Sequence, residues 1–152
     1  MSGPALLDVN ILLALFNPDH VHHELAHDWF ADHHASGWAT CPLTENAFVR
    51  ILSNPKAVAA VQRPDILVGH LTAFCRSRHH TFWPDAVSLR DPKLFKPSFV
   101  AGPRQLTDIY LLGLAKKQGG SMATFDRTIP LGAVIGATRA TLQVITAAES
   151  AR

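Results

Sequence analysis

ALLDVNILLALF, residues 5–16, predicts a short buried strand that passes directly into a short helix. Ala5 to Leu7 form an apolar run of strand length, and Asp8 follows it at once. The next apolar run, from Ile11 to Phe16, predicts a helix that ends near Asn17-Pro18, because a helix rarely continues through the residue that precedes a proline. A strand followed directly by a helix is the unit from which parallel sheets are built.

The same alternation of short apolar runs with longer helical patterns continues along the rest of the chain. Further helices are expected at about 21–34, 43–53, 64–76 and 105–117. Further strands are expected at 37–41, 80–83, 121–125 and 142–146. Residues 84–103 contain four prolines and are expected to be irregular. We therefore predict a single α/β domain over residues 1–152, with a central parallel β-sheet flanked by helices on both faces.

The composition excludes several classes of protein. Of the 152 residues, 47% are hydrophobic and 17% are charged, which is typical of a folded domain with one core and not of a disordered chain. Two cysteines are too few for a disulfide-stabilised secreted domain. No apolar run reaches the roughly 18 residues that a membrane span requires, and the first residues lack a basic segment typical of signal peptides. We expect a cytoplasmic protein that does not contact a membrane.

Four of the twelve acidic residues occupy positions where a surface charge is not required. Asp8 follows the first predicted strand and Asp126 follows the fourth. Glu45 lies at the beginning of the helix after the second strand, and Asp108 lies in the first turns of the helix that precedes the fourth strand. All four therefore map to the carboxyl edge of the predicted sheet, where open α/β folds bind their ligands.

Four carboxylates at one edge would repel one another strongly. A like-charge pair 4 Å apart is unfavourable by about 4 kcal/mol at an effective dielectric constant of 20. A divalent cation relieves this repulsion, and Mg²⁺ prefers oxygen ligands. Such a cation activates a bound water and offsets the charge that develops on a phosphate, so the pattern favours metal-assisted hydrolysis of phosphodiesters. Each acid taken alone also fits a local role as a helix cap or turn residue.

The order and spacing of these motifs resemble the PIN-domain ribonucleases, and within them the VapC-type toxins of type II toxin–antitoxin pairs. The resemblance covers nearly the whole chain. It is carried by LLDVNILLALF (6–16), PLTENAFVRIL (42–52), HTFWPDAVSLRDPKLF (80–95), QLTDIYLLGLAKKQGG (105–120) and ATFDRTI (123–129).

The resemblance implies a single PIN-like ribonuclease domain that cleaves RNA with a water activated by Mg²⁺ or Mn²⁺. It implies a homodimer, a cognate antitoxin protein and an RNA substrate as partners. By this resemblance the catalytic, metal-binding acids are Asp8, Glu45, Asp108 and Asp126, and the polar residues that support them are Asn10, Thr44, Thr107 and Thr124.

Two other interpretations remain open on the sequence alone. His23-Glu24-x-x-His27 matches the metal-binding motif of zinc metalloproteases, and His33 lies where the longer form of that motif has a third ligand. Phe30, however, stands where that form requires a glycine, so a continuous helix would keep His33 about 15 Å from His23 along the helix axis. These histidines are otherwise expected to form a solvated helix face. A catalytically silent binding module is the other alternative.

Overall fold

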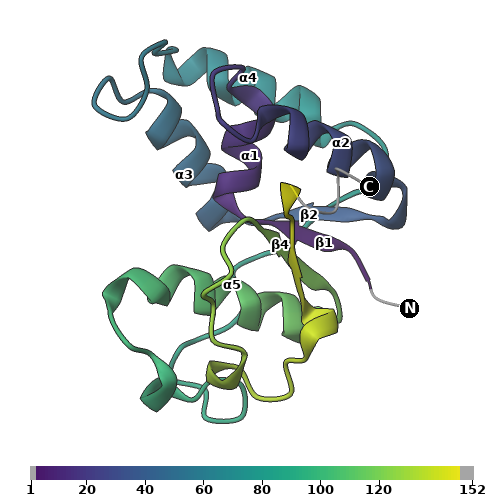
Figure 1. The fold of residues 1–152 in the computed structure, drawn as a ribbon, viewed down its shortest axis with the longest axis vertical. Helices are drawn as coiled ribbons and strands as arrows, with labels where there is room; N and C mark the ends of the chain where they lie inside the picture. The colour runs from purple at the N-terminus through teal and green to yellow at the C-terminus, as the bar shows by residue number, and fades with distance from the viewer. Residues whose placement is uncertain (1–2, 148–152) are drawn as a thin grey trace.

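The computed structural model describes residues 3–147 and contains a parallel sheet of five strands in the order β3-β2-β1-β4-β5 (Figure 1). The strands are β1 (Ala5–Leu7), β2 (Trp38–Thr40), β3 (His80–Phe82), β4 (Ser121–Thr124) and β5 (Leu142–Val144). All four pairings between neighbouring strands are parallel. The two strands at the edges, β3 and β5, are only partly buried, whereas the three central strands are buried throughout.

Helices cover both faces of this sheet, as Figure 1 shows. The helices are α1 (Val9–Phe16), α2 (His23–His33), α3 (Pro42–Leu52), α4 (Pro64–Cys75) and α5 (Leu106–Lys117). The first four pack on one face and α5 packs on the other, together with the segment between β3 and α5. Within the described residues, no helix has the length and hydropathy that a bilayer crossing needs.

Side chains of the central strands alternate between two apolar clusters, one on each face of the sheet. Leu6 and Met122 join the cluster around α5, whereas Leu7 and Ala123 join the cluster around the first four helices. Because both faces are covered, these strands are apolar at seven of their ten positions. The predicted α/β fold with a parallel sheet and helices on both faces is therefore confirmed, including all five predicted strands.

The segment between β3 and α5 is largely irregular, as its prolines predict, but its apolar side chains are buried. Phe95 is almost fully buried and packs on Gly113 of α5 so closely that a β-carbon at Gly113 would lie 2.2 Å from the ring. Glycine at this position therefore allows the segment to pack on α5. This contact holds α5 against the sheet, and α5 carries Asp108 near its amino end.

Candidate active site

Three aspartates meet at the carboxyl edge of the sheet. Asp8 directly follows β1, and Asp126 lies two residues after the end of β4, which is the neighbour of β1 in the sheet. Asp108 lies in the first turn of α5, on the face opposite α1. The charges of Asp8 and Asp126 both act on Asp108, and that of Asp126 also acts on Asp8. The structure thus brings together three of the four predicted acids.

Asp8 is held in place by hydrogen bonds to both of its carboxylate oxygens. Its Oδ2 accepts a hydrogen bond from the Thr124 hydroxyl at 2.7 Å, and its Oδ1 accepts one from the Val9 amide at 2.7 Å, which caps α1. The Thr124 hydroxyl in turn accepts from Asn10 Nδ2 at 3.2 Å and from the Asp126 amide at 3.0 Å. Thr124 therefore links the beginning of α1 to the end of β4, and Asn10 joins the same hydrogen-bond network as Asp8.

Asp126 is positioned by the residues that follow it. Its Oδ1 accepts hydrogen bonds from the amide and the hydroxyl of Thr128, at 2.8 and 2.7 Å. These bonds stabilise the carboxylate and hold the pKa of Asp126 below its ordinary value. Sequence reasoning missed Thr128, although a threonine two residues after an aspartate is the usual partner in a local side-chain turn.

Asp108 is the acid with the most perturbed ionisation. Burial, then the negative charges of Asp8 and Asp126 and a hydrogen bond shared with Asp126, raise the pKa of Asp108 to about 7. Burial also raises the pKa of Asp8, with a further contribution from Asp126, against the hydrogen bonds from Thr124 and Val9 that lower it. Buried carboxyl groups with raised pKa values beside a second and third acid are typical of functional sites.

No basic side chain neutralises this charge. Among residues 3–147 one ion pair is found, between Arg63 and Asp65, and it is exposed at the beginning of α4. Asp8, Asp108 and Asp126 form no ion pair with a lysine, arginine or histidine in this part of the chain. A divalent cation with a preference for oxygen would satisfy the three carboxylates together.

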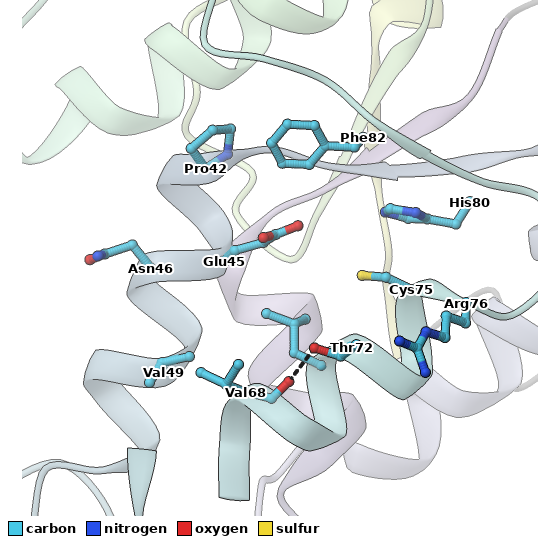
Figure 2. Close-up of a pocket in the computed structure, with 11 residues that line it drawn as sticks. Pro42, Glu45, Asn46, Val49, Val68, Thr72, Cys75, Arg76, His80 and Phe82 are labelled. Atoms are coloured by element: carbon cyan, nitrogen blue, oxygen red, sulfur yellow. Dashed lines mark hydrogen bonds between the residues drawn. The ribbon is translucent and has the colours of Figure 1, made fainter. Parts of the chain in front are cut away.

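Glu45, the fourth predicted acid, lies at the same edge but has other direct partners. It is in the first turns of α3, and its Oε2 accepts a hydrogen bond from the Thr40 hydroxyl at 2.7 Å. Its carboxylate faces a cavity of about 750 Å³ that it shares with Cys75 and His80 (Figure 2). No hydrogen bond joins Glu45 to the three aspartates, all of which lie in the described part of the chain.

Two other predicted supporting residues, both in the described part of the chain, form no side-chain hydrogen bond with the acids. Thr107 is exposed, and its side chain forms no hydrogen bond with any of the four acids, each of which the structure describes. Thr44 is buried and exchanges hydrogen bonds with the backbone of Cys41, so that it fixes the beginning of α3. Thr40 is a residue that sequence reasoning missed, because its role depends on contacts with Glu45 and His80 that no local pattern encodes.

The histidines of α2 are partly solvated as expected, since His27 and His33 are exposed, but they also have a structural role. His23 Nδ1 lies 2.7 Å from the carbonyl oxygen of Ala14, and His27 Nε2 lies 2.7 Å from that of Leu15. These carbonyls belong to the last turn of α1, where helix carbonyls lack intrahelical partners. Since a carbonyl oxygen can only accept, each of these ring nitrogens carries a proton and cannot bind a metal.

The third histidine of the zinc motif is also engaged locally. Helix α2 continues without a break to His33, whose Nδ1 bonds the Trp29 carbonyl at 2.8 Å and whose ring stacks on Trp29. The continuous helix keeps His33 away from His23, as its rise requires. The structure therefore gives no support to a zinc protease centre on α2.

Comparison with curated proteins identifies close relatives over most of the chain. The chain is 43% identical to ribonuclease VapC44 of Mycobacterium tuberculosis over 139 residues, which is 89% of this chain and 94% of the relative. It is 42% identical to ribonuclease VapC39 of the same organism over 132 residues (87% and 95%), and 42% identical to ribonuclease VapC38 over 122 residues (80% and 84%). No protein-family model matches the chain.

Proposed function

The chain belongs to the VapC-type PIN-domain ribonucleases, and from this premise we propose that it is an endoribonuclease toxin that depends on Mg²⁺ or Mn²⁺. The observation that carries the metal dependence is the group formed by Asp8, Asp108 and Asp126, which meets at the carboxyl edge of the sheet without a basic partner. Residues 1–152 act in this proposal as one PIN-like ribonuclease domain.

The donor set fits a hard divalent cation. Three carboxylates offer oxygen ligands only, and Mg²⁺ typically binds one or two protein carboxylates and retains several waters. The raised pKa of Asp108 fits as well, because a nearby cation would favour the ionised form that the other aspartates disfavour. When bound, such a cation would supply a more acidic water and would offset negative charge on the scissile phosphate.

The side chains of this chain fix the acids and orient the attacking water. Thr124 and Val9 fix both oxygens of Asp8, and Thr128 fixes Asp126, so that two of the acids are held rigidly. Asp108 shares a hydrogen bond with Asp126 and has a pKa of about 7. A bound cation would lower this pKa, so the Asp108 carboxylate would be ionised and would accept a hydrogen bond from the attacking water.

Glu45 completes the proposed acid set from the other side of β1. Helix α3 follows β2, the second neighbour of β1, so Glu45 lies at the same sheet edge as Asp8. Its proposed role is to bind the cation with the three aspartates. This role requires its carboxylate to turn from Thr40 toward Asp8, and the substitution Glu45→Gln tests it by loss of RNA cleavage.

The proposed partners follow from membership of the family. An RNA is the substrate, a cognate antitoxin protein binds the toxin, and two copies of the chain form a homodimer in the cytoplasm. Size-exclusion chromatography with light scattering on the purified chain tests the homodimer, with a mass near twice 16.6 kDa as the expected result.

The decisive experiment measures cleavage of RNA by the purified chain. Cleavage is expected with Mg²⁺ or Mn²⁺, is abolished by EDTA, and falls by at least about 100-fold in Asp8→Asn and in Asp108→Asn, since each removes a charge that the cation requires. The control is Asp28→Asn, an exposed aspartate of α2. Folded Asp8→Asn and Asp108→Asn variants that cleave RNA at the wild-type rate would refute the assignment and would leave a binding module as the better interpretation.

A further inference from the structure

The cavity beside α3 brings together three side chains of types that bind transition metals. They come from three different elements: Glu45 from α3, Cys75 from the end of α4 and His80 from the beginning of β3. One ligand atom from each lies within 4.8 Å of those of the other two. We propose that Glu45, Cys75 and His80 form a Zn²⁺-binding site that is distinct from the site of the three aspartates.

The hydroxyl of Thr40 already connects the three side chains. It donates a hydrogen bond to Glu45 Oε2 at 2.7 Å and lies 2.8 Å from His80 Nε2 and 3.9 Å from Cys75 Sγ. The single hydroxyl proton of Thr40 goes to Glu45, so His80 Nε2 donates to Thr40 and must give up this proton when it binds a metal. Thr40 is buried in the sheet and holds the polar atoms of all three residues near its hydroxyl. The cluster is therefore built by the fold and is not a chance meeting of mobile surface groups.

The types of ligand select the metal. A thiolate and an imidazole favour Zn²⁺ over Mg²⁺, which takes oxygen ligands. Ligand atoms around a tetrahedral Zn²⁺ lie about 3.3–3.8 Å apart, so side chains whose ligand atoms lie within 4.8 Å of one another need to close by at most about 1.5 Å. Three protein ligands leave a fourth position free, and because all three line a cavity, a water would have room to occupy it, as in Zn²⁺ sites that retain a water.

The residues around the cluster leave it accessible. In Figure 2 the Glu45 carboxylate, the Cys75 sulfur and the His80 ring face the same open space. Arg76 also lines this cavity but forms no ion pair with Glu45, and both residues are among those described. Cys41, in contrast, is fully buried beside Thr44, which leaves Cys75 as the thiol that a metal in solution reaches.

A consequence for activity rests on the proposed function. Glu45 belongs both to the Zn²⁺ cluster and to the proposed set of catalytic acids. Zn²⁺ bound by Cys75 and His80 would hold the Glu45 carboxylate on its present side, facing Thr40, and keep it from the three aspartates. Zinc bound here would therefore inhibit RNA cleavage that Mg²⁺ supports.

The binding site is tested with Co²⁺ as a spectroscopic substitute for Zn²⁺, on the reduced full-length chain. Wild type is expected to develop a sulfur-to-cobalt charge-transfer band that saturates with one Co²⁺ at this site, and Zn²⁺ removes the band whereas Mg²⁺ does not. Cys75→Ser is expected to lose the band, and His80→Ala is expected to bind Zn²⁺ at least about tenfold more weakly. If Cys75→Ser does not fold, Cys75→Ala replaces it.

Matched controls separate this site from the other metal-binding groups of the chain. Cys41→Ser and His70→Ala, an exposed histidine of α4, are expected to retain the band, as is Asp108→Asn. The histidines of α2 cannot produce a sulfur band. A wild-type protein without the band, or a band that Cys41→Ser removes and Cys75→Ser retains, overturns the proposal.

The inhibition is tested separately in the cleavage assay. In the presence of Mg²⁺, Cys75→Ser is expected to need at least about tenfold more Zn²⁺ than wild type for half-inhibition. Equal inhibition of the two proteins overturns the link to catalysis. If wild type does not cleave RNA with Mg²⁺, it is the proposed function that fails, and the cobalt spectra still decide the binding site.

Discussion

The raised pKa of Asp108 makes the stability of the metal-free protein depend on pH below neutrality. This pKa is 3.8 in the unfolded chain and about 7 in the folded one. At pH values between these two, the Asp108 carboxyl is therefore protonated in the folded state and ionised in the unfolded state. Stability therefore falls as pH rises from about 4 to about 7, and it levels off above this range. The shift of Asp8 has the same sign, whereas the lowered pKa of Asp126 adds stability that is lost only in acid.

We therefore predict that Asp108→Asn stabilises the metal-free protein at pH 8. Since Asp108 is only half-buried, solvent screening limits the gain to about 1 kcal/mol. For a chain of this size that raises the melting temperature by about 2–4 °C. Thermal melts in EDTA at pH 5 and pH 8 measure it, and the difference between variant and wild type should shrink at pH 5. A large drop in melting temperature at pH 8 would instead assign Asp108 a structural role.

Thr124 is predicted to support catalysis through the orientation of Asp8. Thr124→Val removes the hydrogen bond to a buried carboxylate and should destabilise the protein by about 1–3 kcal/mol. RNA cleavage should fall by at least about tenfold at saturating Mg²⁺. Thr124→Ser retains the hydroxyl and should restore both quantities, whereas failure of the serine variant to restore cleavage would contradict the orienting role.

At the scale of elements, the contact between Phe95 and Gly113 places α5. Gly113→Ala would force a β-carbon into a buried ring and is predicted to destabilise the protein by about 1–3 kcal/mol, although alanine is the better helix former. Gly69→Ala on α4 is the matched control, because nothing lies within 4 Å of its β-carbon position. That variant should gain up to about 1 kcal/mol. Urea denaturation measures both values, and equal effects would contradict the packing argument.

His23 and His27 join α2 to the carboxyl end of α1. Each satisfies a carbonyl that would otherwise lack a partner, so His23→Ala should destabilise the protein by about 1 kcal/mol. RNA cleavage should remain within about twofold of wild type, because the residue does not contact the acids. Loss of an activity on peptide substrates in this variant would instead revive the zinc protease interpretation.

At the scale of the whole molecule, a bound cation should stabilise the fold. A ligand that binds only the folded state at 100 times its Kd adds about 2.7 kcal/mol. Saturating Mn²⁺ or Mg²⁺ should therefore raise the melting temperature of wild type by several degrees. Asp108→Asn should abolish most of this shift, while Asp28→Asn should retain it. An equal shift in all three proteins would place the cation elsewhere.

The predicted elements agree with the structure because hydrophobic periodicity is a local property. The strand at 5–7 and the helix that ends before Asn17-Pro18 follow from the apolar runs and the proline that stops them. Pro64 likewise stands at the first turn of α4, where it lacks the amide hydrogen that a helix interior requires. The position of Asp8 and Asp126 after apolar runs also predicted that both would lie at the carboxyl edge.

Contacts between residues far apart in the sequence could not be predicted in this way. Thr124 bonds Asp8 across 116 positions, and Thr40 bonds His80 across 40, because β4 and β3 pair with β1 and β2. The zinc-protease motif on α2 illustrates the same point, since only the packing of α2 on α1 shows that its histidines bond carbonyl oxygens.

The sequence by itself determined the order of strands and helices, the family and the acids that follow the strands, since each is written in local periodicity and short motifs. Only the tertiary structure decided which acids meet, that Glu45 faces Cys75 and His80, and which hydroxyl supports Asp8. The physical reason is that strand order and side-chain packing depend on burial of the sheet's two faces, which the whole chain achieves together.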